Sequence, residues 1–393
     1  MHRSFREIVN ILDKKGSLIH ITKEVNPKFE MPGIMKKLEK EGKAFMFENI
    51  KGSNYKAVGG IFTSMDRYGL IFNEDASESF TYDQAGKKVQ QGISNPIPYI
   101  QNDTGPITEN ILTNDEINLL DLPVPTFFEL DTGPFITAAV GIFKKPGGEI
   151  NVGFYRCLIV DEKHILINAS GLSDLLKSYN WHRENNKEMK VAMVLGAPPA
   201  LLMAAASKSP EHISELDVAG GIIGDGVKVV LGPHTGLPIP ADAEMVIETV
   251  VDLDNMVENT LGEFGAQYGT ETAPMCEVTS ILKRNDAMFY SLMAGRAKEH
   301  NNLGYLTVYG MSEMIKQKIK EVFSFVTDVV VHFDTKIGPL MHLVIAIKKS
   351  SDLQPKEVIN EVFNINMGFS LSQRCSPFFV LFFTLFPLSF FQP

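Results

Sequence analysis

The first 110 residues alternate between apolar patterns of helical spacing and of strand spacing. Residues 5–12 place four apolar side chains on one helical face, and Ser4 with Glu7 forms a capping box in front of them. We expect Gly16 to end this helix. The pattern then predicts a strand at 17–25, a helix at 34–41 and a strand at 44–47. The segment therefore has the organisation of a small α/β domain.

A proline-containing connector separates this segment from a strand-rich one. Residues 119–125 read Leu-Leu-Asp-Leu-Pro-Val-Pro, and their prolines exclude both a helix and the interior of a sheet. From about residue 127 to 310, turns that contain Gly and Pro separate short apolar runs. Within this part we predict turns at 132–134 and 145–148, a strand at 190–195 and a helix at 200–207.

The C-terminal part returns to α/β patterning and then changes character. We predict a helix at 311–323, strands at 326–331 and 340–347, and a helix at 355–363. From Asn366 the chain becomes rich in Phe, and the apolar stretch 377–391 is shorter than the ~20 residues that a spanning helix needs. Pro387 interrupts this stretch, so we expect an atypical hydrophobic tail rather than a membrane anchor.

Composition and charge narrow the functional class. The chain has 393 residues, of which 44% are apolar and 21% charged, as in globular proteins with two or three domains. Its net charge of −10 argues against a general binder of nucleic acid or of anionic membranes. The three cysteines are far apart and odd in number, which is typical of free thiols in a reducing compartment. Because the chain starts with an amphipathic helix rather than a signal peptide, we expect a cytoplasmic protein.

The strand predicted from residue 151 to 160 carries polar residues that are unusual for a core strand. It opens with Asn151 and holds Arg156 five residues later. An odd separation places the two side chains on opposite faces of a regular strand, and a bulge at Gly153 would bring them to one face. Taken alone, the two residues also fit a turn-capping Asn and an Arg on an edge strand.

Several acids could combine with this strand into a chemical site. The candidates are Asp174, Glu215, Asp217, Glu258 and Glu263. One amide oxygen and one or two carboxylate oxygens form a hard ligand set that suits Mn²⁺ or Mg²⁺ rather than Zn²⁺. Two acids five residues apart, with an arginine in reach, would make a proton-transfer unit. Glu258 and Glu263 fit the solvated end of a helix equally well.

The spacing of the glycines excludes a glycine-rich loop that binds nucleotides. No Gly-x-Gly-x-x-Gly follows a predicted strand, and the glycines of residues 220–226 do not have the required separation. The sequence therefore predicts neither a Rossmann dinucleotide site nor a P-loop.

Six motifs, in this order, give the chain a resemblance to a known family. They lie at 122–125 (Leu-Pro-Val-Pro), 131–137 (Asp-Thr-Gly-Pro-Phe-Ile-Thr), 151–156, 196–200 (Gly-Ala-Pro-Pro-Ala), 214–220 (Ser-Glu-Leu-Asp-Val-Ala-Gly) and 239–248 (Ile-Pro-Ala-Asp-Ala-Glu-Met-Val-Ile-Glu). Over residues 1 to about 364 the chain resembles the UbiD family of prenylated-flavin-dependent decarboxylases. That family includes the 3-polyprenyl-4-hydroxybenzoate carboxy-lyases.

The resemblance implies an α/β (α+β) fold of three domains. These are an N-terminal α/β domain at 1–112, a central FMN-binding split β-barrel at 113–308 and a truncated C-terminal α/β domain at 309–365, with the hydrophobic tail at 366–393. The segment that follows the last α/β helix in the family, and that helps to form oligomer contacts, is missing from this sequence. We therefore expect an incomplete C-terminal domain.

The resemblance also implies a cofactor and metal site. The metal would bridge the protein and the cofactor phosphate through Asn151 and Glu215, and Asp174 stands where some relatives carry a metal-binding His. Glu244 and Glu248 belong to the last motif and are expected to be structural. The residues implied to line the flavin are Phe154, Tyr155, Arg156, Asn168, Ala169, Ser170, Ser173 and Asp174.

The acid loop of the family, Glu-Gly-Pro-Phe-Gly followed by Glu or Asp, is altered in this chain. Aligned by the spacing between acids, Glu258 and Glu263 supply the pair. Aligned by Phe264-Gly265, the first acid falls on Leu261 and the proton donor on Ala266. We adopt the first alignment, because a decarboxylase needs an acid to protonate the product carbanion.

The implied reaction is the reversible, non-oxidative decarboxylation of an α,β-unsaturated or aromatic carboxylic acid. Loss of CO₂ leaves an electron pair on an sp² carbon, and prenylated FMN is the implied electron sink. Arg156 would hold the substrate carboxylate, Glu263 would deliver the proton and Glu258 would tune the pair. Mn²⁺ or Mg²⁺, with K⁺ as a further candidate, would complete the site.

The resemblance implies three kinds of partner. They are an aromatic, heteroaromatic or isoprenoid acid as substrate, a flavin prenyltransferase that supplies the cofactor, and other copies of the chain in a homo-oligomer, with neither nucleic acid nor membrane. Two other functions stay open. The altered loop would fit a non-catalytic, flavin-binding subunit of a carboxylase complex. A flavin oxidoreductase on the same barrel is the second alternative, although no dinucleotide fingerprint is present.

Overall fold

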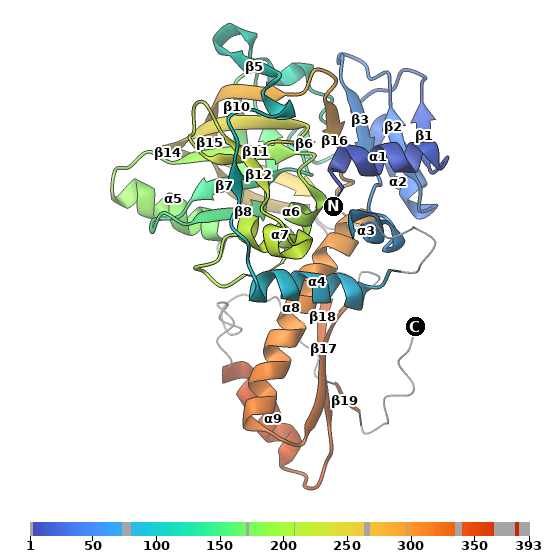
Figure 1. The fold of residues 1–393 in the computed structure, drawn as a ribbon, viewed down its shortest axis with the longest axis vertical. Coiled ribbons are helices and arrows are strands. Elements are labelled where there is room, and N and C mark those ends of the chain that lie inside the picture. Colours follow the sequence, from blue (N-terminus) through green and yellow to red (C-terminus); the bar gives the residue numbers. More distant parts are fainter. Residues whose placement is uncertain are drawn as a thin grey trace. The chain divides into compact units, whose positions relative to one another are not determined.

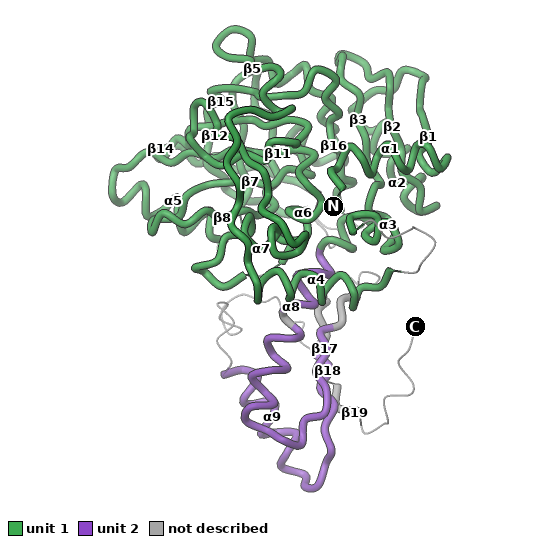
Figure 2. Tube along the Cα trace, in the orientation of Figure 1, with its two compact units in different colours: residues 1–303 green, residues 304–393 purple. Residues whose placement is uncertain are grey.

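The computed structural model divides the chain into two compact units, residues 1–303 and 304–393 (Figure 2). Both units combine helices with sheets, so the chain is a mixed α/β protein. The residues that the structure describes are 3–72, 80–169, 173–207, 209–262, 268–295, 297–334, 340–364 and 382–384. The domain boundaries expected from the sequence, at 112, 308 and 365, stay predictions.

A four-stranded sheet in the first unit is completed by a strand from far along the chain. Its order is β1 (Leu18–Ile21), β2 (Ala44–Phe47), β3 (Lys56–Gly59) and β16 (Met288–Tyr290). β1 pairs with β2 and β3 with β16 in parallel, whereas β2 and β3 are antiparallel. The strand predicted at 44–47 is confirmed. The contribution of β16 could not be read from local periodicity, because it depends on pairing between distant segments.

Helices α1 and α2 lie against this sheet (Figure 1). α1 (Phe5–Lys14) has the predicted capping box between Ser4 and Glu7, and its apolar face is buried. Gly16 follows this helix with φ at +66°, a conformation that glycine adopts without strain. α2 spans Glu30–Lys40 and begins before the predicted start at residue 34. The proline that precedes residue 34 lies in the first turn of the helix, where proline is tolerated. α3 (Asp66–Gly69) and α4 (Tyr82–Ser94) follow.

The largest element of the first unit is a nine-stranded sheet. Its order is β6-β9-β10-β15-β14-β11-β7-β8, and β5 pairs with β15 outside this path. The strands are β5 (Asn110–Thr113), β6 (Phe135–Ile136), β7 (Val140–Lys144), β8 (Ile150–Phe154), β9 (Arg156–Ile159), β10 (His164–Asn168), β11 (Lys190–Leu195), β14 (Met245–Gly262) and β15 (Tyr268–Lys283). Among the described residues no ladder joins β6 to β8, so no closed barrel is detected, and the split β-barrel stays a prediction.

Three helices and a small sheet accompany the nine-stranded sheet. α5 (Asp174–Glu184) and α7 (Glu215–Ile223) both begin after a serine, Ser173 or Ser214, whose side chain accepts a backbone N–H of the first turn. α6 (Pro199–Ala206) is almost entirely buried and, like α7, contacts β8. The small sheet and the 3₁₀ turns are β4 (Ile100–Gln101), β12 (Lys228–Leu231), β13 (Pro238–Pro240), Leu70–Phe72, Pro106–Thr108, Asn114–Glu116 and Leu119–Asp121.

One hydrophobic core joins the four-stranded and nine-stranded sheets of the first unit. Phe45 and Phe47 from β2 belong to the same buried cluster as Tyr155, Ile167 and Met193 from the larger sheet. The cluster also includes Cys157 and Cys276, which are buried free thiols, in agreement with the expected absence of a disulfide between them. The larger sheet therefore places its polar residues on a rigid support.

The long helix α8 (Lys298–Val322) begins in the first unit and continues into the second. The sequence predicted its start at 311, because residues 298–310 contain several Asn and Gly of low helix propensity. Its first turn is anchored by Glu299, which is fully buried. The Glu299 carboxylate accepts the N–H groups of Gly60 and Phe62 at 2.7 and 2.8 Å and the Tyr290 hydroxyl at 2.8 Å.

The second unit is a small α/β layer. β17 (Val326–Asp334), β18 (Leu340–Ile347) and β19 (Phe382–Thr384) form its sheet, with α9 (Gln354–Asn364) after β18. Its separate core contains Ile315, Ile319 and Ile345. Apart from 382–384, the predicted hydrophobic tail lies outside the described residues. Within the described ranges, every helix is either too short or too polar to cross a membrane.

Candidate active site

The strand that carries Asn151 and Arg156 changes its partner strands at Tyr155. β8 pairs with β7, and β9, which begins at Arg156, pairs with β6 and β10. No bulge lies at Gly153, because the β7–β8 register runs without a shift from Lys144–Ile150 to Val140–Phe154. A Cβ atom on Gly153 would lie 3.1 Å from the Tyr155 hydroxyl, so this glycine leaves room for the phenol ring instead.

Asn151, Asp174 and Glu215 converge from three different elements. Glu215, in the first turn of α7, accepts the backbone N–H of Val152 at 2.8 Å through Oε2. In the amide orientation that matches donors with acceptors, Asn151 Nδ2 donates to Asp174 Oδ2 at 3.2 Å and Oδ1 accepts the Val152 N–H at 3.1 Å. The arrangement brings together the two residues that the sequence proposed as metal ligands, with Asp174 beside them.

The local electrostatics favour a bound cation. Burial of its carboxyl group, together with the charge of the nearby Asp174, raises the pKa of Glu215 to about 7. Burial also raises the pKa of Tyr155, and the charges of Asp174 and Glu215 act in the same direction. A divalent cation between these oxygens would offset the cost of moving the Glu215 carboxylate out of water, whereas Asp174 is partly exposed and pairs with Lys177 at 3.0 Å. The donor set of two carboxylates and an amide oxygen suits Mn²⁺ or Mg²⁺.

This donor set is smaller than a complete protein cage. Across the residues that the structure describes, no three His, Cys, Asp or Glu side chains gather as a metal site would require. Hard divalent ions commonly take phosphate oxygens as ligands, so a cofactor phosphate would supply the further oxygen donors. The residues present therefore fit a metal that the protein and a phosphate share.

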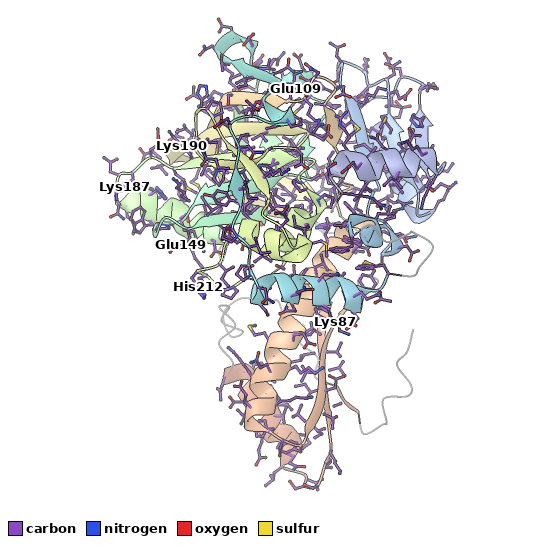
Figure 3. The ribbon with its side chains drawn as sticks, viewed as in Figure 1. Lys87, Glu109, Glu149, Lys187, Lys190 and His212 are labelled. Atoms are coloured by element: carbon purple, nitrogen blue, oxygen red, sulfur yellow. The ribbon has the colours of Figure 1, made fainter. Side chains whose placement is uncertain are left out.

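Two segments that flank this site contact each other within the first unit. Figure 3 labels Glu149, in the turn between β7 and β8, and His212, which precedes α7. Lys145 from the same turn donates from Nζ to the carbonyl of Glu211. The charge of Lys145 also lowers the pKa of Glu215, against the larger effect of burial.

A second polar group lies on β9, β10, β14 and β15 and includes the strand partner of Arg156. Asn168 is the cross-strand partner of Arg156 and is 4% exposed. Its Nδ2 donates to Asn259 Oδ1 at 2.8 Å and approaches Glu271 Oε2 at 3.4 Å. The sequence analysis missed Asn259 and Glu271. Their only signal is the alternation of polar and apolar residues along two long strands.

The predicted acids are not gathered in the described part of the site. Glu258 is exposed and lies on β14 opposite Thr272, in a strand rather than in a loop. Its neighbour Asn259 is buried, and successive side chains of a strand point to opposite faces. Glu263 and the proposed flavin-lining Ser170 lie outside the described residues. Their roles stay predictions.

Asp131 holds the end of β14. Its Oδ1 accepts the Gly262 N–H at 2.8 Å, and its Oδ2 accepts the N–H groups of Phe127 and Phe128 at 3.1 and 2.9 Å. Burial raises the pKa of Asp131, while these hydrogen bonds and the charge of Arg156 oppose the shift. Asp131 belongs to a motif that the sequence singled out, but its role became clear only from these contacts.

The remaining motif residues support the structure. Glu244 and Glu248 are fully buried, as expected of structural acids. Glu244 accepts Arg6 Nε at 2.9 Å and the Met288 N–H at 3.0 Å. Glu248 accepts the Thr235 N–H at 2.9 Å. Of the other predicted flavin-lining residues, Phe154 and Ala169 are partly exposed, and Ser173 caps α5.

A surface cleft of about 430 Å³ lies elsewhere on the large sheet. Its charged and ionisable lining residues are Asp161, His164, Asp252 and Glu277. None of the residues predicted for the cofactor, metal or acid roles lines it. The cleft is therefore separate from the site around Asn151 and Arg156.

Comparison with known protein families shows to which family this chain belongs. Residues 99–297 match the 3-octaprenyl-4-hydroxybenzoate carboxy-lyase Rift-related domain, and residues 9–82 match the N-terminal domain of the same carboxy-lyase family. The chain belongs to the UbiD family. The resemblance noted from the six motifs is confirmed.

Relatives of this UbiD chain share its fold at low sequence identity. An uncharacterized protein of Aquifex aeolicus (strain VF5) is 27% identical over 349 residues, which cover 82% of this chain and 71% of that protein. An evolved dimeric form of the UbiD-class enzyme HmfF from Pelotomaculum thermopropionicum, in complex with prFMN, is 25% identical. The match has a TM-score of 0.80 and covers 92% of this chain and 82% of that chain.

A third relative shows the same fold. The vanillic acid decarboxylase of Sedimentibacter hydroxybenzoicus, in its closed form, has a TM-score of 0.81 at 23% identity, over 93% of this chain and 78% of that chain. The solved structures that resemble this UbiD chain therefore include decarboxylases. The chain is a member of a decarboxylase family, and its own reaction is a separate question.

Proposed function

We propose that this UbiD chain catalyses the reversible, non-oxidative decarboxylation of an α,β-unsaturated or aromatic carboxylic acid, with prenylated FMN and a divalent metal. The observation that carries the proposal is the convergence of Asn151, Asp174 and Glu215 around the Val152 N–H. A divalent cation would neutralise the carboxylates of this set, of which Asp174 also pairs with Lys177 at 3.0 Å. Membership of a carboxy-lyase family supports the same reaction class.

The metal ligands proposed from this chain are Asn151 and Glu215, with Asp174 as a third oxygen donor. Mn²⁺ or Mg²⁺, with K⁺ as a further candidate, would be held between them and the cofactor phosphate. Glu215 stands at the N-terminus of α7, where the helix dipole favours a negative charge in the absence of a metal. Tyr155, which packs against Gly153, would form the wall beside this site.

The flavin is proposed to lie along the residues from Phe154 to Arg156 and near Asn168, Ala169, Ser173 and Asp174, with Ser170 as a further expected contact. When bound, prenylated FMN supplies an electron sink for the electron pair of the broken carbon–carbon bond. Asn168 supports this placement, because its Oδ1 is buried and has no hydrogen-bond partner in the described part of the chain. A ligand N–H group would satisfy it.

Arg156 is proposed to bind the substrate carboxylate. A guanidinium keeps its charge at any working pH and can bind a carboxylate through two parallel hydrogen bonds. The proton that replaces CO₂ on the product carbon would come from Glu263, which the sequence selects by the spacing of acids. A positioned acid contributes roughly 10²–10⁴-fold to the rate of such a step.

The decisive experiment identifies the bound cofactor. The full chain is purified from cells that also express a flavin prenyltransferase, and its cofactor is characterised by mass and absorbance before a panel of aromatic, heteroaromatic and isoprenoid acids is tested. We expect prenylated FMN, a stoichiometric divalent metal and CO₂ release from at least one acid. Tight binding of flavin without turnover on the whole panel would instead support a non-catalytic, flavin-binding subunit. The exposure of Glu258 is the observation that favours this second candidate.

We also propose that the chain forms a homo-oligomer in the cytoplasm. One relative with the same fold is described as a dimeric form. Size-exclusion chromatography with light scattering measures the mass directly, and a monomer across micromolar concentrations would contradict the proposal.

A further inference from the structure

We propose that Glu271 is a positioning residue of the decarboxylase site, where it orients Asn168 and supplies the negative charge beside Arg156 that the sequence assigned to Glu258. This inference rests on the proposed function, because it assumes that Arg156 binds a carboxylate. No motif marks Glu271, which lies in the return strand of the long β14–β15 hairpin.

Strand pairing places the relevant side chains on one face of the sheet. Asn168 of β10 is the antiparallel partner of Arg156 of β9, and Asn259 of β14 is the partner of Glu271 of β15. Antiparallel partners point to the same face of a sheet. The hydrogen bonds of Asn168 to Asn259 and Glu271 join the two pairs, so all four residues share this face.

The Asn168 amide is oriented by these contacts. Its Nδ2 has two protons, and the two acceptors in reach are Asn259 Oδ1 and Glu271 Oε2. Asn259 is itself fixed, because its Nδ2 donates to the backbone carbonyl of Glu271 at 3.4 Å. With both protons used, Asn168 Oδ1 remains buried without a partner among the described residues and can only accept from a ligand.

Glu271 is also well placed to influence Arg156. Their strands are separated by β10 alone, which corresponds to about 10 Å between backbones at the usual strand spacing. Both side chains are long enough to approach each other across Asn168. Because Glu271 is partly buried, its charge is screened less than that of an exposed acid.

Glu258 is exposed and precedes the buried Asn259 by one residue, so its side chain points to the other face of β14. Asp254 is an exposed acid of the same hairpin that has no role in the proposed site, which makes it the control for Glu271.

The test compares Glu271→Gln with Asp254→Asn in the full chain loaded with flavin. Glutamine keeps an oxygen that can accept from Asn168 but has no charge. The first readout is the Kd of benzoate, an inert carboxylate, by calorimetry. Removing an anion near Arg156 should tighten benzoate binding about three- to tenfold in Glu271→Gln. Asp254→Asn should change it less than about twofold, because solvent screens the charge of this exposed acid.

The second readout is turnover of an identified substrate. We expect kcat of Glu271→Gln to fall about tenfold or more while KM falls or stays the same, because the substrate is bound but held in a less reactive position. Glu271→Asp, which keeps the charge, should restore the wild-type Kd. A purely structural role would weaken binding and turnover together.

The outcomes separate this inference from the proposed function. Tighter benzoate binding in Glu271→Gln alone would support the inference even if no acid is decarboxylated, in which case only the reaction class fails. If the enzyme decarboxylates its substrate and Glu271→Gln matches Asp254→Asn in both Kd and kcat, the inference is overturned. If Glu271→Gln does not fold, Glu271→Asp must then match wild type in Kd and kcat, and a large change in either would overturn the inference.

Discussion

Glu215 accepts the backbone N–H of Val152 at 2.8 Å, and this contact ties the first turn of α7 to the strand that begins beside Asn151. The bond fixes the carboxylate next to the Asn151 amide without the help of a metal. Two sequence motifs that lie far apart in the chain are thereby joined into one site. The predictions below start from this relationship.

The first prediction concerns the metal. Asn151→Ala removes an oxygen ligand beside Glu215, and we expect loss of the bound metal and at least a tenfold weaker retention of flavin. Metal content by elemental analysis and flavin absorbance after gel filtration measure the effect. Glu149→Ala, which changes an exposed residue in the preceding turn, serves as the control and should retain both. Unchanged metal and flavin in Asn151→Ala would remove this residue from the site.

The second prediction concerns the catalytic proton. Glu263→Gln should lower turnover by 10² or more, and with it the incorporation of solvent deuterium at the product carbon, because the amide has no proton to give. Cofactor binding should not change. Glu258→Gln, at an exposed position, should remain within about threefold of wild type. Full activity of Glu263→Gln would show that the alignment by Phe264-Gly265 is correct.

The third prediction concerns stability and pH. Glu39 is 3% exposed, and burial together with the charge of Glu299 raises its pKa from 4.5 to about 8. Between these values the folded chain binds more protons than the unfolded chain, so the contribution of Glu39 to stability falls as the pH rises. Glu39→Gln should therefore gain about 1–3 kcal/mol near pH 8 and little near pH 4.5.

Urea unfolding of Glu39→Gln at several pH values measures this dependence. Glu41→Gln, at an exposed neighbouring position, is the control and should follow the wild-type profile. A gain that is the same at every pH would mean that Glu39 is ionised in the folded protein throughout.

The fourth prediction concerns the glycines around Tyr155. A Cβ atom on Gly141 would lie 2.8 Å from Tyr155 Cδ2 and 3.1 Å from Met193 Sδ, so Gly141→Ala forces the buried phenol to move. We expect about 1–3 kcal/mol of destabilisation and weaker flavin binding. Gly33→Ala, in an open position of α2, should instead stabilise the chain by about 0.5–1 kcal/mol. Equal melting temperatures for the two variants would contradict the packing described for Tyr155.

The sequence by itself determined the local elements and one part of the site. The helix after Ser4 and the strand at 44–47 follow from capping chemistry and from short-range periodicity, which act between residues close in the chain. The pairing of Asn151 with Glu215 followed from the ligand chemistry of two motifs and from the resemblance to a family. In the structure Glu215 accepts the N–H of Val152, the residue after Asn151, and the role of the two residues as metal ligands stays a prediction.

The tertiary structure alone decided the strand partners and the surroundings of Arg156. The chain changes partners at Tyr155 instead of forming a bulge, and Glu271, not Glu258, approaches Asn168. Both outcomes depend on which strands pair and in which register. A shift of one residue in β14 or β15 would exchange the faces of Glu258 and Asn259. Register is set by the packing of the whole sheet over its core, and local periodicity does not encode it.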